Sequence, residues 1–280
     1  MTASPAAAGG DAADAAADEA LAGLLRALAA RSYRFVTTTP LTHGRVLARR
    51  AGEIARDLRD VFGWNMLFDR ACVEPGMLAA MERAGVLLVR GDLLQSAVRV
   101  ATVGDTAFLH SAYPTVQDDS VFFGPDTYRF VRFIEQALQA SAARASSGPV
   151  RVLDVGCGSG AGGIAAAQWL GRRGVAAELT LNDINPRALR FAAINAQVAG
   201  VPVALALGDA FRAVAGDFDL VISNPPYMAD TRRRAYRDGG GGLGRELSVR
   251  IVAEALSRLA PGGQLLLYTG VAKKSNAHEQ

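Results

Sequence analysis

The spacing of apolar residues changes along the chain and predicts two kinds of structure. From about Glu19 to Arg59, and again over Pro75–Gly85, apolar residues recur at the spacing of amphipathic helices. In the first of these segments they are Leu21, Leu24, Leu25, Leu28, Val46, Leu47, Ile54 and Leu58. Short apolar runs follow as far as His110, interrupted by Gly91-Asp92 and Gly104-Asp105, and they predict strands joined by tight turns.

The second half of the chain has apolar runs that are nearly continuous. Strands are predicted at 149–156, 177–183, 201–209, 218–224 and 263–270, with helices at about 160–173, 185–199 and 245–259. Strands that alternate with helices predict an α/β fold with a doubly wound, mostly parallel sheet covered on both faces. Ligands of such sheets bind beyond the carboxyl ends of the strands, where the strand order reverses.

These patterns suggest three parts. Residues 1–18 are Ala-rich and acidic, which predicts a disordered tail. Residues 19–115 form a smaller α+β domain, and residues 116–280 form the α/β domain. Helices followed by a hairpin are loosely similar to a winged-helix arrangement, but the hairpin has few basic residues. We therefore favour a small accessory domain without DNA contact.

Composition narrows the class of protein. The formal net charge of +3 is too small to indicate nucleic-acid binding by itself, and the two cysteines have no metal-ligand spacing, so no metal is expected. No apolar run reaches the ~18 residues that span a bilayer. The first twenty residues lack the basic start and Leu-rich core of a secretory signal, which favours a cytoplasmic protein that does not bind membranes.

The glycine-rich segment "LDVGCGSGAGG" (Leu153–Gly163) follows the first strand of the α/β domain and opens a helix. Gly158, Gly160 and Gly163 match the dinucleotide-binding pattern G-x-G-x-x-G. Asp154 argues against a dinucleotide, because a carboxylate at the strand end would repel a pyrophosphate. S-adenosylmethionine carries a sulfonium and an ammonium and no phosphate, so it suits this position better, and a dehydrogenase is disfavoured.

Two more carboxylates end the next strands. Asp183 lies 23 residues after Gly160, near the separation at which an acidic residue binds ribose hydroxyls. Asp209, in "GDAF", is placed to accept a hydrogen bond from an adenine amino group. The alternative for each is a helix N-cap, since Asp is a favoured cap.

The fourth strand ends in "VISNPPY" (Val221–Tyr227). Proline cannot continue a ladder, and it holds the residue before it extended. Asn224 and Pro225 are therefore both extended, with carbonyls free of the sheet. A plain strand-ending turn is the alternative, since Asn-Pro is common in turns.

Together "VLDVGCGSG", "NDIN", "GDAF" and "NPPY" resemble the class I S-adenosylmethionine-dependent methyltransferases, which implies a Rossmann-like sheet of order 3-2-1-4-5. "VFFGPDTYRF" (Val121–Phe130) and "DGGGGLGRELSVRIV" (Asp238–Val252) are most similar to the release-factor glutamine methyltransferase branch. The resemblance implies cofactor contacts by the following residues. They are Phe123, Pro125, Thr127, Asp154, Gly156, Gly158, Gly160, Asp183, Ile184, Asp209, Ala210 and Asn224.

The catalytic residues implied by the resemblance are Asn224, Pro225, Pro226 and Tyr227. The Asn224 side chain and the Pro225 carbonyl each accept one hydrogen of a planar NH₂ group, and Tyr227 stacks on it, which is catalysis by positioning. A protein glutamine amide, as in a release factor, is the leading acceptor. An exocyclic adenine or guanine amine in RNA or DNA is the alternative, and a catalytically silent cofactor- or nucleic-acid-binding module is a third.

Three segments around this motif carry further expectations. The basic run Thr231–Arg237 is either a solvated face or a clamp for an acidic partner, and Gly239–Gly244 suggests a flexible lid. Only ten residues follow Gly270, too few for the strand pair that usually ends this class, so the fifth strand is expected to form an open edge.

Overall fold

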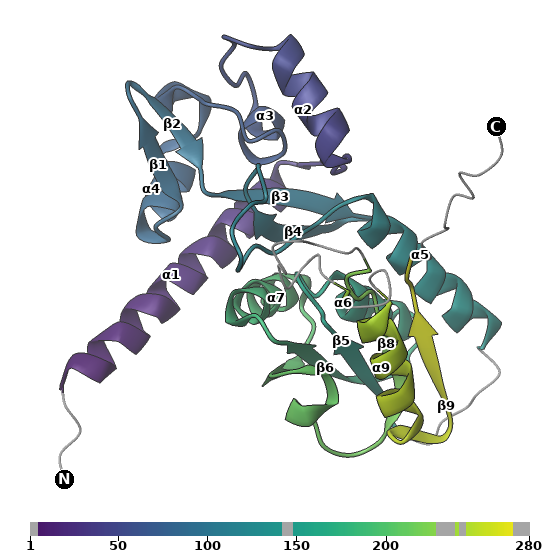
Figure 1. Cartoon of the computed structure of the whole chain (residues 1–280). Coiled ribbons are helices and arrows are strands. Elements are labelled where there is room, and N and C mark those ends of the chain that lie inside the picture. The colour runs from purple at the N-terminus through teal and green to yellow at the C-terminus, as the bar shows by residue number, and fades with distance from the viewer. Residues whose placement is uncertain (1–4, 142–147, 228–238, 241–244, 271–280) are drawn as a thin grey trace, which may run out of the picture.

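A five-stranded parallel sheet forms the centre of the α/β part (Figure 1). The computed structural model describes residues 5–141, 148–227, 239–240 and 245–270. The strands are β5 (Val150–Val155), β6 (Ala177–Asp183), β7 (Val203–Leu207), β8 (Phe218–Ser223) and β9 (Leu259–Leu267). Their order is β7-β6-β5-β8-β9, which confirms the predicted order 3-2-1-4-5. Within the described ranges β9 is an edge strand, as expected.

Helices cover both faces of this sheet. One face is covered by α5 (Pro125–Ala140), α6 (Ala161–Gly171) and α7 (Pro186–Ala199). The other is covered by α9 (Glu246–Leu256) and the short η2 (Ala210–Ala213). Neighbouring residues on β5 point to opposite faces, so Val152 packs with the first group and Leu153 with the second. This confirms the doubly wound fold.

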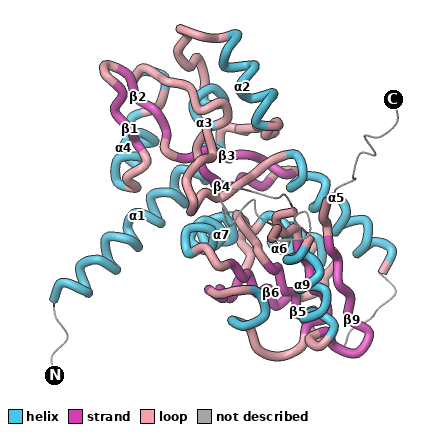
Figure 2. The backbone as a smooth tube through the Cα atoms, viewed as in Figure 1, coloured by secondary structure: helices cyan, strands magenta, loops and turns pink. Residues whose placement is uncertain are grey.

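The N-terminal part contains helices and two hairpins, which lie above the sheet in the view of Figure 2. Its helices are α1 (Pro5–Ala30), α2 (Pro40–Arg49), α3 (Leu58–Phe62), η1 (Arg70–Cys72) and α4 (Pro75–Arg83). Its strands are β1 (Leu87–Arg90), β2 (Leu93–Ser96), β3 (Val98–Val103) and β4 (Thr106–Ser111). The two Gly-Asp steps form the hairpin turns, as predicted, with Gly91 and Gly104 at positive φ. The loose winged-helix likeness stays a prediction.

The acidic segment expected to be disordered is instead part of α1, which runs from Pro5. Alanine is the best helix former, and the helix is anchored farther along. Asp18 accepts from Arg190 at 2.5 Å and Glu19 from Gln197 at 2.9 Å, both on α7. Neither α1 nor any other helix in the described ranges has the length and apolar character to cross a membrane.

The N-terminal part and the sheet domain share one hydrophobic core. Leu21, Leu25 and Leu28 of α1 pack in a cluster that also contains Phe191 and Ile194 of α7. The boundary predicted near residue 115 therefore does not separate two independent cores. The N-terminal part is packed against α7, and its residues Thr39, Pro40 and Leu41 border the cavity at the carboxyl ends of the strands.

Candidate active site

A cavity of about 670 Å³ lies at the carboxyl ends of β5, β6 and β8. Of the residues expected to form the site, Pro125, Thr127, Asp154, Gly156, Gly158, Asp183, Ile184, Asp209, Ala210, Asn224, Pro225, Pro226 and Tyr227 line it. Parallel strands place their carboxyl ends at one edge of the sheet, which is why segments so far apart in sequence meet here. The volume is in the range of small-molecule sites.

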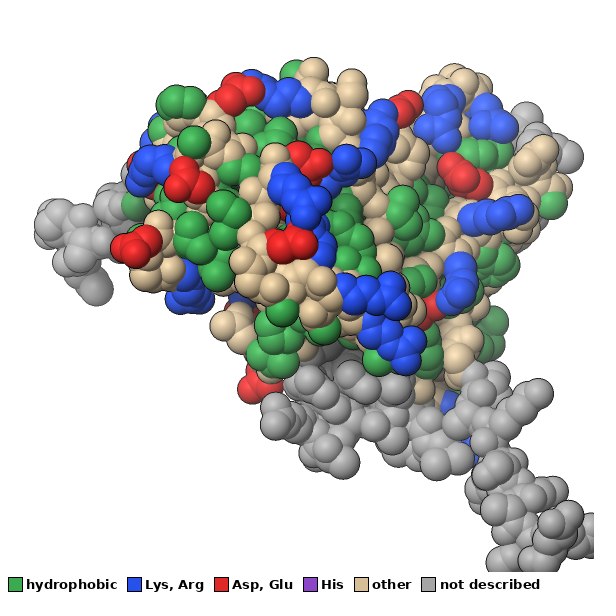
Figure 3. Space-filling view, turned by 90° about the horizontal axis from the view of Figure 1, so that it is seen from above, with side chains coloured by type: hydrophobic (Ala, Val, Ile, Leu, Met, Phe, Trp, Pro, Cys, Tyr) green, Lys and Arg blue, Asp and Glu red, His purple; other side chains and the backbone are tan. Residues whose placement is uncertain are grey.

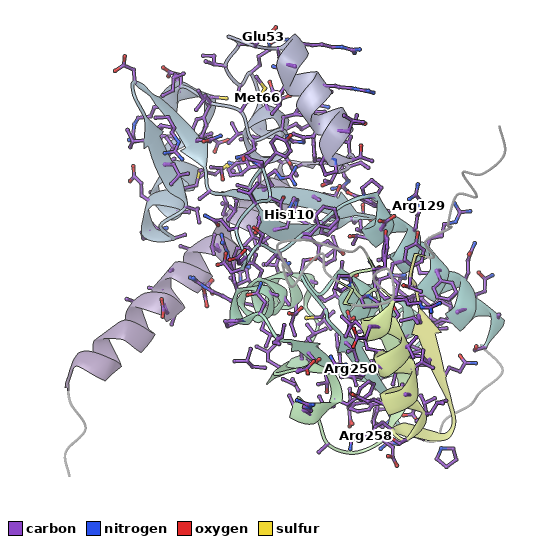
Figure 4. The ribbon with its side chains drawn as sticks, viewed as in Figure 1. Glu53, Met66, His110, Arg129, Arg250 and Arg258 are labelled. Carbon is purple, nitrogen blue, oxygen red and sulfur yellow. The ribbon has the colours of Figure 1, made fainter. Side chains whose placement is uncertain are left out.

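Two expected residues, Gly160 and Phe123, do not line the cavity. Gly160 caps α6 in the left-handed conformation, with φ of +77°. A Cβ there would lie 3.1 Å from the Cβ of Ala192, so this glycine lets the helix pack closely. Phe123 is 1% exposed and stacks with His110 in the core (Figure 4). Its neighbour Phe122 lines the cavity instead, because successive side chains of an extended segment point to opposite sides.

Asp154 is the buried carboxyl beneath the glycine loop. It is 1% exposed and accepts a hydrogen bond of 2.8 Å from the backbone N–H of Gly163, in the first turn of α6. Burial raises the pKa of Asp154 to about 7, and the nearby Asp183 adds to the increase. The described residues supply no cation to Asp154, so a positively charged ligand in the cavity would compensate its charge.

The raised pKa of Asp154 predicts a pH dependence of stability in the ligand-free protein. A carboxyl whose pKa is higher in the folded state than in the unfolded state binds more protons when folded, so stability falls as the pH rises. The pKa increases from 3.8 to about 7, so the loss should develop between about pH 4 and pH 7. Its size should be on the order of a few kcal/mol.

The test is to measure the melting temperature against pH for the wild type and for Asp154→Asn, both without cofactor. Asparagine keeps an oxygen for the Gly163 N–H but cannot ionise, so the decline between pH 4 and pH 7 should be shallower in the variant. Parallel curves for the two proteins would show that Asp154 does not titrate in this window.

Asp183 is fixed by two backbone donors. Its Oδ2 accepts from Gly158 N–H and its Oδ1 from Asn185 N–H, each at 2.9 Å. Asn185, not Asp183, is the N-cap of α7, so the helix-cap alternative does not describe Asp183. Burial raises the pKa of this carboxyl, while the backbone N–H groups of Asn185, Gly158 and Ile184 oppose the increase. Each oxygen keeps a lone pair for a ligand hydroxyl.

Asp209 has a partner that the sequence did not indicate. Arg250 of α9 donates to both of its oxygens, at 2.7 and 2.5 Å (Figure 4). These hydrogen bonds lower the pKa of Asp209, which therefore stays ionised. Asp209 makes no side-chain cap to η2. It still lines the cavity, so an adenine amine would share this carboxylate with Arg250.

The Asn-Pro-Pro-Tyr segment leaves β8 at the cavity. Ser223 donates to the carbonyl of Val155 at 2.8 Å, which ties the end of β8 to the end of β5. Within the described residues, the side-chain amide of Asn224 has no hydrogen-bond partner, although Asn224 is partly buried and lines the cavity. An amide that only closed a turn would bond the local backbone. This one remains available for a ligand.

Tyr227 is joined to the segment that precedes α5. Its hydroxyl donates to Asp126, which also accepts from Arg129 at 2.9 Å. Burial and the Asp126 carboxylate raise the pKa of Tyr227, so its hydroxyl keeps its proton. The tyrosine ring also lies over Gly270, where a Cβ would come within 2.4 Å of it. The orientation of the aromatic ring is therefore fixed from two sides.

We expect Tyr227→Phe and Asp126→Ala to affect acceptor use in the same way. Each breaks the hydrogen bond between the Tyr227 hydroxyl and the Asp126 carboxylate, worth ~1.5–3 kcal/mol, so kcat/KM for the acceptor should fall at least about tenfold. The double variant should lose little more than either single one, because both changes break the same contact. Additive losses in steady-state kinetics would mean that the two residues act separately, and Asp126→Asn, which retains an acceptor oxygen, is the milder control.

Several residues of the cavity were not identified from the sequence. Thr39, Pro40 and Leu41 come from the start of α2, and Asp126 and Arg129 come from α5. The start of α2 reaches the site only because the N-terminal part packs against the sheet domain. No local sequence pattern predicts this packing. The basic run 231–237 and residues 241–244 of the expected lid lie outside the described residues.

The family model described as "Methyltransferase small domain" matches residues 136–278. A release factor glutamine methyltransferase of Bordetella pertussis is 31% identical over 221 residues, which are 74% of this chain and 75% of the relative. One of Deinococcus radiodurans is 37% identical over 128 residues, 42% of this chain and 44% of the relative. A ribosomal RNA small subunit methyltransferase C of Chromohalobacter salexigens is 37% identical over 117 residues, 42% of this chain and 30% of the relative. The chain thus spans less than half of two of these three relatives.

Proposed function

Because this chain belongs to the class I S-adenosylmethionine-dependent methyltransferases, in the release-factor glutamine methyltransferase branch, we propose that it methylates a glutamine side-chain amide of a protein. The observation that carries the proposal is the Asn224 amide, which has no hydrogen-bond partner in the described residues and lies in one cavity with the glycine loop. The relative aligned over 75% of its length is named for this activity.

The cavity has the groups that the cofactor requires. Asp154 supplies a buried negative charge without a cation, and Asp183 supplies two oriented oxygens for hydroxyl groups. When bound, S-adenosylmethionine supplies a methyl group on a sulfonium, and the leaving sulfur takes the electron pair of the broken bond. The donor set therefore fits the cofactor.

Asn224 and Pro225 act on the acceptor. The lone pair of an amide NH₂ group is conjugated, so this nitrogen is a weak nucleophile. The side-chain oxygen of Asn224 accepts one N–H and the carbonyl of Pro225 accepts the other, which directs the nitrogen at the methyl carbon. The N-methylated amide is at first cationic and strongly acidic, so it releases one of these two protons to solvent water and becomes neutral. Tyr227 stacks on the flat group.

The test uses methyl-labelled cofactor with either a bacterial release factor or total RNA as acceptor. We expect label in the protein, and mass spectrometry of its peptides should place the added methyl on a glutamine. Label that enters only RNA and is released by nuclease would reject the glutamine proposal. It would favour the alternative acceptor, an exocyclic base amine of RNA, and one of the relatives is named as a ribosomal RNA methyltransferase.

A further inference from the structure

The start of α2 forms part of the wall of the cavity. Thr39 caps this helix by accepting from Thr42 N–H at 3.2 Å, and Pro40 occupies its first turn. Thr39, Pro40 and Leu41 line the cavity together with Asn224 and Tyr227. The first turn of α2 and Asn224 therefore border the same cavity.

One face of α2 extends from this wall away from the cavity. Leu41, Arg45 and Arg49 follow one another at four-residue spacing, so they share one face of the helix. We call these three residues the α2 stripe. Leu41 is 64% exposed, both arginines are exposed, and neither arginine has an acidic partner among the described residues. The next residue, Arg50, instead pairs with Asp60 at 2.5 Å and Glu53 at 2.9 Å.

The opposite face of α2 is fixed in the N-terminal core. His43 is 1% exposed; its Nε2 donates to the Trp64 carbonyl at 3.0 Å and its Nδ1 accepts from Arg99 at 3.3 Å. Burial lowers the pKa of His43 to about 4, so the ring stays neutral. A Cβ at Gly44 would lie 3.1 Å from the Tyr113 hydroxyl, which shows how closely this face packs. The α2 stripe is therefore held at a fixed position beside the cavity.

Two other features accompany the α2 stripe: an exposed apolar side chain just before α2, and basic residues on α5. Val36, just before α2, is 65% exposed. Arg129 of α5 lines the cavity, and Arg132, one turn farther along, is exposed. Figure 3 views the molecule from above, where basic side chains lie on the surface with apolar and acidic side chains between them.

We propose that the α2 stripe binds an acidic segment of the protein acceptor that flanks the methylated glutamine. This inference rests on the proposed function and specifies which surface of the enzyme binds the acceptor protein. Unpaired arginines attract carboxylates, and Leu41 and Val36 add the apolar contact that protein interfaces use. An RNA partner is less suited, because α2 exposes no aromatic ring on which a base would stack, and the net charge is only +3.

The experiment measures methylation of a release factor by the full-length wild type, Arg45→Glu/Arg49→Glu and Arg83→Glu. Arg83 is an exposed arginine in the last turn of α4, outside the cavity lining, so its reversal is a control for a general change in charge. For the double variant we expect KM for the acceptor to rise about tenfold at low salt, with kcat and cofactor affinity unchanged. The difference should shrink as salt screens the charges. Poly-glutamate should compete with the acceptor for the wild type and much less for the double variant.

The outcomes separate this inference from the proposed function. If the wild type methylates the release factor and the double variant has the same KM, the α2 stripe does not bind the acceptor, although the glutamine proposal stands. An equal rise in KM for Arg83→Glu would also reject a specific role. If the wild type methylates RNA and no protein, both proposals fail. Circular dichroism checks that the exposed substitutions leave the fold intact.

Discussion

Replacing Asn224 with alanine should lower kcat by ~10²–10³, because it removes one preorganised partner of the acceptor nitrogen. Cofactor affinity should stay near that of the wild type, since the carboxylates proposed to bind the cofactor, Asp154 and Asp183, lie at other strand ends of the cavity. The stability of the fold should change little, because within the described residues the Asn224 amide makes no hydrogen bond that the substitution would break. Single-turnover methyl transfer and calorimetric titration of the cofactor measure the two effects separately.

Asn224→Asp is the informative companion. It keeps an acceptor oxygen at the same position, so it should retain more activity than Asn224→Ala. An alanine variant that is folded, binds cofactor and transfers methyl at the wild-type rate would show that Asn-Pro-Pro-Tyr only ends the strand.

Asp183→Ala should weaken cofactor binding by about tenfold to a hundredfold, because a hydrogen bond from a ribose hydroxyl to a carboxylate contributes ~1.5–3 kcal/mol. The substitution also removes the acceptors of Gly158 N–H and Asn185 N–H, so the glycine loop loses its support from β6. Isothermal titration of S-adenosylmethionine measures the change.

Glu178→Ala is the matched control for Asp183, since Glu178 is an exposed carboxylate near the other end of the same strand. It should bind cofactor like the wild type. If Asp183→Ala also binds with unchanged affinity, the carboxylate holds the loop without contacting the ligand.

The sheet and its strand-end residues could be predicted because their signals are local. Continuous apolar runs identify the parallel strands, and each carboxylate or amide of the site lies at or near the carboxyl end of one of them. The strand order came from the family resemblance and was correct. The observed ends of helices and strands differ from the predicted ends by a few residues. For example, β9 spans Leu259–Leu267 and was expected at 263–270.

The remaining features depend on contacts between distant segments. The pairing of Asp209 with Arg250 needs α9 to lie beside the end of β7, and the pairing of Tyr227 with Asp126 spans 101 residues. Residues 5–18 were expected to be disordered, because the contacts that anchor α1 to α7 join segments far apart in the sequence. Phe123 was predicted to line the cavity, but Phe122 lines it instead. Neighbouring side chains of an extended segment point to opposite sides, so an error of one residue selects the wrong side.

The core that α1 shares with α7 limits how this architecture can diverge. A different N-terminal region could replace the present one only if it also covered Phe191 and Ile194, which would otherwise leave an apolar patch in water. A substitution on α7 that disturbs this cluster can alter the packing of α1 even where the sheet stays intact. Exchange of the N-terminal part between relatives therefore requires matching changes along α7.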